Sequence, residues 1–448
     1  MSQVENGQKD SKESPAVLRA ISVAGYKSIG ERQRIEIRPL TLLAGANSGG
    51  KSSLIQPMLL LKQTLEAPYD PGSLLLDGPN VRLTSADQLL SKCADTIAKK
   101  QFVIGAEIGK IKIEFRFSKN QEGLLGITEN KIDGLVLSDK LGPYEIRSML
   151  DDSRSLVESR IIALLDLYNK FEISVTRDRF YFVIAARAAN AGVSYTPLWL
   201  PSDIEFLDLL REMIHVPGLR GNPERTYKTT AVGNAFPGTF ENYVASVINH
   251  WKLTDDARLA DLGKQLAIIG LASKIEANRL NDAQVELKVS RLPTSSRQDT
   301  EDWVSIADVG FGVSQTLPVL VALLAAKPGQ VVYLEQPEIH LHPRAQLAMA
   351  RILAEAAQRG VIVIAETHSA LLLQGVQTLV AKDELDKDLV KLHWVQRDEQ
   401  GMTRVNSADL DETGAFGDWP VDFMEVGLDA DHEYLSAAEA KLCRSAAP

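Results

Sequence analysis

The chain has 448 residues, and 49 Lys and Arg against 59 Asp and Glu give a formal net charge of −10. Hydrophobic residues make up 45% and charged residues 24%, which excludes collagen-like, mucin-like and wholly disordered chains and allows two or three domain-sized units. The acidity argues against a protein that coats nucleic acid by bulk charge, although it leaves a local basic groove open.

The N-terminal elements predict a buried strand that leads through a glycine-rich turn into a helix. Residues 1–15 are polar and lack periodicity, so we expect a disordered tail. Strands are expected over residues 20–23, 33–37 and 39–44, and a helix over 54–65. The third strand is a continuous apolar run, which is typical of a buried strand in an α/β sheet. The helix contains Pro57, which is tolerated only near the first turn.

The rest of the chain combines a mixed middle with a regular last third. In the middle, β-like runs are expected over residues 101–117, 124–137, 171–184 and 285–289, and helices over 149–168, 204–214, 243–251 and 259–271. The last third predicts a helix at 313–326, a strand at 331–334, a helix at 343–359, and strands at 361–365 and 391–396. This alternation indicates a largely parallel sheet covered by helices.

The cysteine content and the hydropathy predict a reduced, cytoplasmic protein. Cys93 and Cys443 are too few for a disulfide framework and too far apart in sequence for a CxxC metal site. No apolar run approaches the roughly 20 residues needed to span a bilayer, and the polar start is unlike a signal peptide. We therefore expect no membrane segment.

The turn after the first buried strand fits the phosphate-binding pattern GxxxxGK(S/T) at every position. Its residues are Gly45, Ala46, Asn47, Ser48, Gly49, Gly50, Lys51 and Ser52, followed by Ser53. A strand before the motif and a helix after it are the context that a P-loop requires. Backbone N–H groups would wrap the phosphates, Lys51 would reach the β- and γ-phosphates, and the Ser52 hydroxyl would bind Mg²⁺. The sequence therefore predicts ATP and Mg²⁺ as cofactors.

A second strand ends in a carboxylate, as hydrolysis requires. Residues 331–335 form an apolar run that ends in Glu335, the Walker B pattern with Glu in place of Asp. We expect Glu335 to be the carboxylate on the metal side, where it acts through water. Glu338 has a weaker claim as a base. His340 and His342 follow and could form a zinc site, but alternate residues of an extended segment point in opposite directions, which favours loop histidines that pack against a neighbouring subunit.

A histidine follows the next buried strand. His368 lies in the segment Glu366-Thr367-His368-Ser369, at the carboxyl end of the strand predicted over 361–365. Ligands of open α/β sheets bind at that edge, so His368 is expected to sense the γ-phosphate by a hydrogen bond.

Together these motifs resemble the ABC-type ATPases of the SMC and OLD (overcoming lysogenization defect) superfamily, especially stand-alone bacterial AAA-family ATPases. The matching segments are residues 25–28, the P-loop, 217–221 with Arg225 and Tyr227, 308–315, 335–343 and 366–369. The patch at 417–420 resembles the small domain of unknown function that closes such proteins. The resemblance implies an α/β fold of the P-loop NTPase class: an ABC-ATPase-like head with a mixed sheet, a helical and β insertion, and a small C-terminal subdomain.

The domain limits follow from that fold. Residues 16–85 and 216–400 are expected to form one split head, because the P-loop and the Walker B strand must meet in space. Residues 86–215 are then an inserted α+β region, and residues 401–448 are the C-terminal subdomain.

The resemblance also assigns residues. Residues 310–315 stand at the ABC signature, so the glycines of this segment and Ser314 would contact the γ-phosphate bound to the opposite subunit of a head-to-tail homodimer. Gln315 is expected to belong to the same nucleotide-binding segment. Arg220 and Arg225 would either clamp phosphate or form structural contacts in the core loop. The Q-loop glutamine would be Gln63 or Gln88.

One departure from the family concerns catalysis. The usual ABC pattern ends in Asp-Glu, whereas this chain has Glu335-Gln336, and the neutral amide of Gln336 cannot accept a proton as a general base. Either Glu338, Glu366 or His368 takes that role, or turnover is slow.

The leading hypothesis is an ATPase that dimerises on ATP and switches a separate effector, such as a nuclease or toxin in bacterial anti-phage defence. A DNA-repair ATPase of the SMC type would have long coiled-coil arms, and this chain lacks the sustained heptads that such arms need. An OLD-type nuclease would carry a Toprim domain, and the segment around Asp429 and Asp431 is too short for one. A transporter subunit is disfavoured by the degenerate signature. Binding of nucleic acid is left open.

Overall fold

The computed structural model describes residues 17–92, 100–142, 144–146, 148, 171–188, 196–198, 201–290, 302–417 and 432–438. The tail predicted at 1–15, the helix predicted at 149–168, both cysteines, the patch from residue 418 onward and the pair Asp429 and Asp431 lie outside these ranges. Within them, no helix is long and apolar enough to cross a membrane.

A six-stranded sheet forms the centre of the head. Its order is β11 (Ile214–Val216), β16 (Val331–Glu335), β17 (Ile362–Thr367), β3 (Leu40–Ala44), β18 (Val390–Arg397) and β19 (Thr403–Ala408). The first five strands run parallel, and β19 is antiparallel to β18. The predicted helix-covered, largely parallel sheet is thus confirmed, with β17 between the P-loop strand β3 and the Walker B strand β16.

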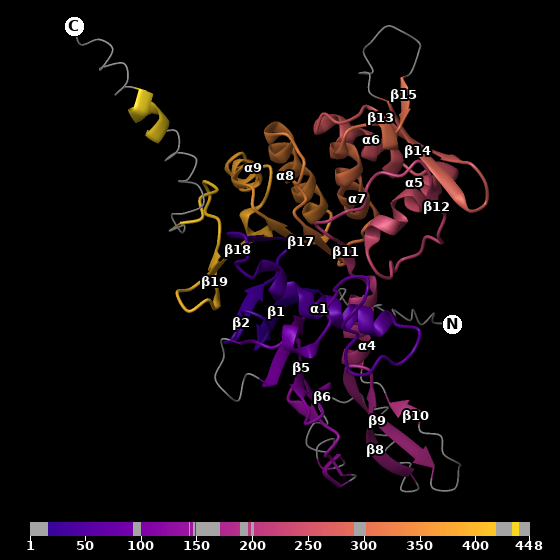
Figure 1. Ribbon diagram of the computed structural model, residues 1–448, viewed down its shortest axis with the longest axis vertical. Helices are drawn as coiled ribbons and strands as arrows, with labels where there is room; N and C mark the ends of the chain where they lie inside the picture. Colours follow the sequence, from indigo (N-terminus) through magenta and orange to yellow (C-terminus); the bar gives the residue numbers. More distant parts are fainter. Residues whose placement is uncertain are drawn as a thin grey trace, which may run out of the picture.

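Helices cover both faces of this sheet (Figure 1). On one face α1 (Lys51–Glu66) packs against Leu43, Tyr333 and Ile364. The opposite face is covered by α7 (Phe311–Ala325), α8 (Pro343–Gln358) and α9 (Ala370–Ala381). Alternate residues of each strand therefore enter two different cores, which is why the strands read as continuous apolar runs.

Two predicted helices differ from their expected limits. The helix α1 begins three residues earlier than expected, at Lys51, so Pro57 lies in its second turn. The helix predicted at 204–214 is α4 (Pro201–Glu212), and residues 214–216 instead form β11, parallel to β16. The prediction of a helix through Ile214 is therefore wrong. A proline at 217 disfavours helix in the residue before it, and pairing with β16 satisfies the extended backbone.

An antiparallel sheet packs on the α1 side of the head. Its order is β2 (Gln33–Glu36), β1 (Leu18–Ala24), β4 (Gln101–Ile108), β5 (Ile111–Lys119), β6 (Leu125–Ile132) and β7 (Leu135–Leu137). Because β1 pairs with β4, this sheet crosses the expected limit at residue 86. Likewise β19 extends the central sheet beyond residue 400. The domain limits stay predictions.

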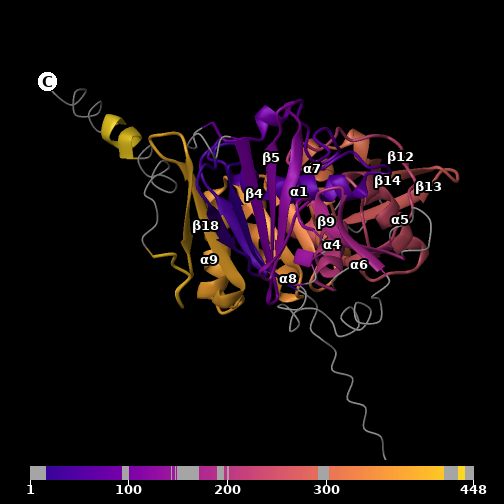
Figure 2. The ribbon, with the colours of Figure 1, turned by 90° about the horizontal axis from the view of Figure 1, so that it is seen from below.

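The remaining elements form two peripheral groups. The strands β12 (Tyr227–Lys228), β14 (Gln284–Ser290), β13 (Lys274–Arg279) and β15 (Trp303–Ser305) form a sheet beside α5 (Val244–Leu253) and α6 (Arg258–Ile268). The strands β8 (Phe171–Asp178), β9 (Tyr181–Ala188) and β10 (Thr196–Leu198) form a small sheet that lies at the opposite end of the molecule (Figure 1). Figure 2 shows β18 and α9 on one side of the molecule and β12, β13 and β14 on the other. Short 3-10 turns occur at Ala86–Gln88, Phe240–Tyr243, Ile306–Asp308 and Lys387–Leu389.

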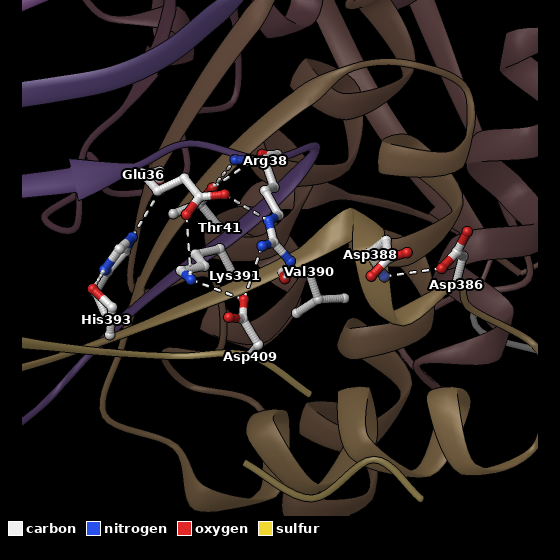
Figure 3. A network of polar contacts seen from close by, with 10 residues as sticks. Glu36, Arg38, Thr41, Asp386, Asp388, Val390, Lys391, His393 and Asp409 are labelled. Carbon is white, nitrogen blue, oxygen red and sulfur yellow. Dashed lines mark hydrogen bonds and ion pairs between the residues drawn. The ribbon is translucent and has the colours of Figure 1, made fainter. Parts of the chain in front are cut away.

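A polar network joins β19 to the start of the head (Figure 3). Asp409 accepts from Lys391 Nζ at 2.8 Å and lies 2.9 Å from Arg38, whose Nε donates to Glu36 at 2.9 Å. The Nε2 of His393 lies 2.7 Å from the carbonyl oxygen of Glu36, so Nε2 carries the proton. Burial lowers the pKa of His393 to about 4, which keeps the ring neutral. The network ties the segment before β3 to the first residues of β18 and to Asp409, which follows β19.

Candidate functional site

The P-loop is held against the sheet at two glycines. A Cβ atom on Gly45, whose φ is +143°, would lie 2.0 Å from the carbonyl oxygen of Val395, and one on Gly50, whose φ is +109°, would lie 2.2 Å from Thr403 Oγ1. Both positions therefore require glycine. The N-terminus of α1 has no side-chain cap, and the loop apex around Asn47 is exposed, so its N–H groups are available to an anion.

The P-loop lysine is ordered by its own loop. Lys51 is buried, and its Nζ donates to the carbonyl oxygens of Gly45 at 3.0 Å and Ala46 at 2.9 Å. The same Nζ lies 3.4 Å from His368 Nδ1. Burial, and then the charge of Lys51, lower the pKa of His368, which favours the neutral ring. Because an ammonium group can only donate, a hydrogen bond between the two requires Nδ1 to be the acceptor. The two residues predicted to meet the γ-phosphate are therefore adjacent.

The P-loop serine contacts a carboxylate that the sequence singled out only as an alternative base. Ser52 Oγ donates to Glu366 Oε2 at 2.8 Å, and the hydroxyl of Tyr333 donates to Glu366 Oε1. Glu366 is buried, and burial together with the charge of Glu335 raises its pKa to about 7. A buried carboxylate beside the P-loop serine is a group that a divalent cation would stabilise.

The Walker B carboxylate Glu335 is turned toward the edge of the sheet. Its Oε2 accepts from the N–H of Gly218 at 3.0 Å, and its Oε1 lies 3.1 Å from His215 Nε2. Asn80 Oδ1 in turn lies 3.0 Å from His215 Nδ1. Burial opposes ionisation, but these contacts outweigh it and hold the pKa of Glu335 below its usual value. The expected metal pair of Ser52 and Glu335 is thus not in contact here, and Ser52 contacts Glu366 instead.

Sequence reasoning missed Asn80, His215 and Tyr333. The side chain of Tyr333 is part of an apolar strand and reads as core. His215 alternates with Ile214 and Val216, both of which face the core on the α7 side, and it stacks on Tyr333 with ring centroids 5.4 Å apart. Only the pairing of β11 with β16 brings His215 to Glu335.

Glu338 has one oxygen committed and one free. Its Oε1 accepts from Thr367 Oγ1 at 2.7 Å and from the N–H of His368 at 3.0 Å. Its Oε2 is buried and has no hydrogen-bond partner among the described residues. The neighbouring Gln336 has a left-handed φ of +47°, and its N–H donates to the carbonyl oxygen of Glu366 at 2.9 Å. Strained, non-glycine backbone of this kind is concentrated at functional sites.

The signature segment opens α7 and is tied to the loop after β11. Ser314 Oγ donates to the carbonyl oxygen of Phe311 at 3.1 Å, and Gln315 Nε2 donates to that of Gly221 at 3.1 Å. Phe311 itself is 55% exposed and Leu219 is 93% exposed. The signature therefore presents an apolar, accessible surface.

The two arginines differ in their surroundings. Arg220 is buried and donates to the carbonyl oxygens of Gln315 and Glu335, each at 2.8 Å. Burial lowers its pKa to about 10, so it stays charged at neutral pH. This geometry favours the structural alternative for Arg220 over a phosphate clamp. Arg225 forms an exposed pair with Asp308 at 2.7 Å, and its role toward phosphate stays a prediction.

Neither candidate for the Q-loop glutamine reaches the site. Gln63 is buried in α1, and its amide bonds the carbonyl oxygen of Leu75 at 2.6 Å and the N–H of Val81 at 2.9 Å, which supports the loop that carries Asn80. Gln88 accepts from the N–H of Thr84 at 2.9 Å.

The zinc alternative gains no support. His342 accepts from the N–H of Arg344 at 3.3 Å and so caps α8, and His340 is exposed. The described part of the chain contains no cluster of three or more side chains that could hold a metal ion.

The fold and the site define a P-loop NTPase with an ABC-type head. A glycine-rich loop links β3 to α1, and a strand that ends in a histidine loop separates β3 from the Walker B strand. Residues 219–374 match the sequence model of the family described as "AAA domain, putative AbiEii toxin, Type IV TA system". The match spans the signature, the Walker B strand and His368, and the P-loop lies before it. This segment is thus similar to AAA domains, in line with the predicted resemblance.

Solved structures similar to this chain include heads of SMC proteins. An SMC head bound to the C-terminal winged-helix domain of ScpA is 12% identical, with a TM-score of 0.48, and the match covers 88% of this chain and 98% of that chain. The SMC head of Thermotoga maritima is 11% identical, with a TM-score of 0.40, and the match covers 87% of this chain and 98% of that chain. The ScpA-bound SMC head derived from Pyrococcus furiosus is 13% identical, with a TM-score of 0.46, and the match covers 88% of this chain and 96% of that chain. These likenesses concern the fold alone. No curated protein matches the chain.

Proposed function

We propose that the protein binds and hydrolyses ATP and works as a switch that dimerises head to tail on ATP. The observation that carries this proposal is the convergence of Lys51, Ser52, Glu338 and His368 at the carboxyl ends of three parallel strands. The Oε2 of Glu338 is buried there and has no hydrogen-bond partner among the residues that the structure describes. The donors fit the ligands: uncapped N–H groups and Lys51 suit phosphates, and a hydroxyl beside a buried carboxylate suits Mg²⁺. Bound Mg²⁺ would neutralise phosphate charge.

Glu338 is the general base in this proposal. Gln336 stands where ABC proteins carry their base, and its amide cannot take a proton. Glu338 keeps one oxygen on Thr367 and His368, which orients the carboxylate, while the other oxygen is free to accept a proton from the attacking water. In the same step the bond between the γ-phosphorus and the leaving oxygen of ADP breaks. Neutral His368, next to Lys51, holds the γ-phosphate end of the site.

The second half of each site would come from a partner copy. Ser314 bonds within its own helix, and both Phe311 at the start of that helix and Leu219 in the loop after β11 are exposed. A homodimer would cover these side chains and bring Ser314 to the γ-phosphate of the other subunit. ATP would then favour the dimer, and hydrolysis would loosen it.

The partner of this switch is proposed to be a separate effector in the bacterial cytoplasm. The matched family description names a toxin of a toxin–antitoxin system, which supports a role in anti-phage defence alongside a nuclease or toxin. A soluble switch of net charge −10 suits a protein partner at least as well as nucleic acid.

The test compares the full chain with Lys51→Ala, using Lys264→Ala as the matched control because Lys264 is exposed and pairs only at the surface with Asp261. We expect the wild type and the control to bind ATP, to hydrolyse it, and to gain dimer mass in light scattering. Lys51→Ala should lose all three. A wild type that binds no nucleotide would refute the proposal. Stimulation of hydrolysis by duplex DNA with a steep salt dependence would favour the DNA-repair alternative. Metal-dependent nicking of DNA by the pure protein would favour the nuclease alternative.

A further inference from the structure

The metal side of the site contains two glutamates from neighbouring strands. Glu335 ends β16 and Glu366 lies near the end of β17, and the two are directly paired in the register of these parallel strands. Residues in register on adjacent strands point to the same face of a sheet, which here is the face covered by α1. The site therefore holds two carboxylates side by side, and they differ in what surrounds them.

We propose that Glu366, and not the Walker B residue Glu335, supplies the carboxylate that binds the Mg²⁺ of bound nucleotide together with Ser52. This inference rests on the proposed ATP-binding function of the same site. It assigns Glu335 a supporting position behind Glu366, at the edge of the sheet.

Strand order is the first argument. Because β17 lies between β16 and β3, the end of β16 is two strand spacings from the P-loop strand, about 10 Å, whereas β17 is one spacing away, about 5 Å. Only the nearer carboxylate contacts the serine, with Ser52 Oγ 2.8 Å from Glu366 Oε2.

The second argument is the bonding capacity of each carboxylate. Both oxygens of Glu335 are occupied, one by the backbone N–H of Gly218 and the other by the ring of His215. Glu366 is bonded by the hydroxyls of Ser52 and Tyr333, which rotate and can yield a lone pair to a cation. Such a buried carboxylate next to another is stabilised by a cation, and Mg²⁺ in nucleotide sites usually takes one or two carboxylates.

Nucleotide affinity measured with and without Mg²⁺ tests this assignment without relying on turnover. The full-length wild type, Glu366→Gln and the matched control Glu335→Gln are titrated with ATP, once with excess Mg²⁺ and once with EDTA. We expect Mg²⁺ to tighten ATP binding in the wild type, and Glu366→Gln to lose roughly ten- to hundred-fold of that gain. Its affinity in EDTA should be equal or higher, because a negative charge near the triphosphate is removed. Glu335→Gln should keep most of the gain.

Two further measurements keep the test decisive. Glutamine is isosteric, and its neighbours Ser52 and Tyr333 can each donate or accept, so binding in EDTA reports a folded Glu366→Gln site. Mn²⁺ can replace Mg²⁺, and its electron paramagnetic resonance titration in the presence of ATP should show weaker Mn²⁺ binding in Glu366→Gln alone. The opposite pattern, with the gain lost in Glu335→Gln and retained in Glu366→Gln, would overturn the assignment. Absence of ATP binding in the wild type would instead refute the proposed function.

Discussion

Replacement of Glu338 by glutamine should separate ATP binding from hydrolysis. Glutamine keeps a carbonyl oxygen where Glu338 Oε1 accepts from Thr367 and His368, so the local structure is retained. At Oε2, a charged oxygen that is buried and unpartnered among the described residues becomes a neutral amide. The cost of an unpaired buried charge exceeds that of an unpaired buried amide, so the variant should be at least as stable as the wild type.

The catalytic effect follows from the loss of the proton acceptor. General-base catalysis contributes roughly 10²–10⁴-fold, so the hydrolysis rate should fall by that factor, which corresponds to about 3–5 kcal/mol in the activation free energy. ATP affinity should be nearly unchanged, because Lys51 and Ser52 remain. The ATP-bound dimer should therefore accumulate in the variant.

Single-turnover hydrolysis and light scattering with ATP measure both effects. Glu384→Gln is the matched control, since Glu384 is exposed and its carboxylate pairs with Arg351 at the surface. A Glu338→Gln variant that hydrolyses ATP at the wild-type rate would refute the assignment of the base. A variant that hydrolyses slowly but also fails to bind ATP would show that Glu338 acts in binding.

Three further outcomes follow from the packing. Gly45→Ala would place a Cβ 2.0 Å from the carbonyl oxygen of Val395, so we expect a loss of about 3 kcal/mol in unfolding free energy and weak ATP binding. The control Gly221→Ala, which has open space around its Cβ position, should leave the unfolding free energy in chemical denaturation unchanged. Arg220→Lys cannot reach both carbonyl oxygens that the guanidinium bonds, so it should cost about 1–3 kcal/mol in stability; weaker ATP binding at unchanged stability would contradict this. His393 has a folded pKa of about 4, below its unfolded value of 6.5, so the unfolded chain binds more protons and stability falls as the pH drops between these values. In urea unfolding, the wild type should therefore lose about 2 kcal/mol relative to His393→Leu from about pH 7.5 to about pH 4.5. Parallel pH profiles of the two proteins would exclude the effect.

Local sequence was enough to predict the parts of the site that are continuous in the chain. The P-loop is a strand, a turn and a helix start, and the turn itself gives Gly45 and Gly50 positive φ angles that favour glycine. The apolar runs predicted β3, β16 and β17, because strands buried on both faces lack alternation. The segment Glu366 to Ser369 was expected at the carboxyl end of its strand, and it lies there.

Predictions failed or stayed open where partners come from distant segments. The helix expected through Ile214 ends at Glu212, because pairing with β16 favours an extended backbone for the next residues. The role of Arg220 could not be chosen from sequence, since its acceptors are carbonyl oxygens of α7 and β16. Asn80 carries no sequence signal at all, and its loop is positioned by the buried amide of Gln63.

The sequence by itself therefore predicted the P-loop NTPase fold, because the phosphate-binding motif is a contiguous run of residues between a strand and a helix. It also predicted a carboxylate on the metal side of the site, and it placed at position 336 an amide, which cannot accept a proton as a base. Which carboxylate faces Ser52 was decided only by the tertiary structure. Strand order places β17 between β16 and β3, and no pattern along the chain encodes that order, so Glu366 and not Glu335 contacts the P-loop serine.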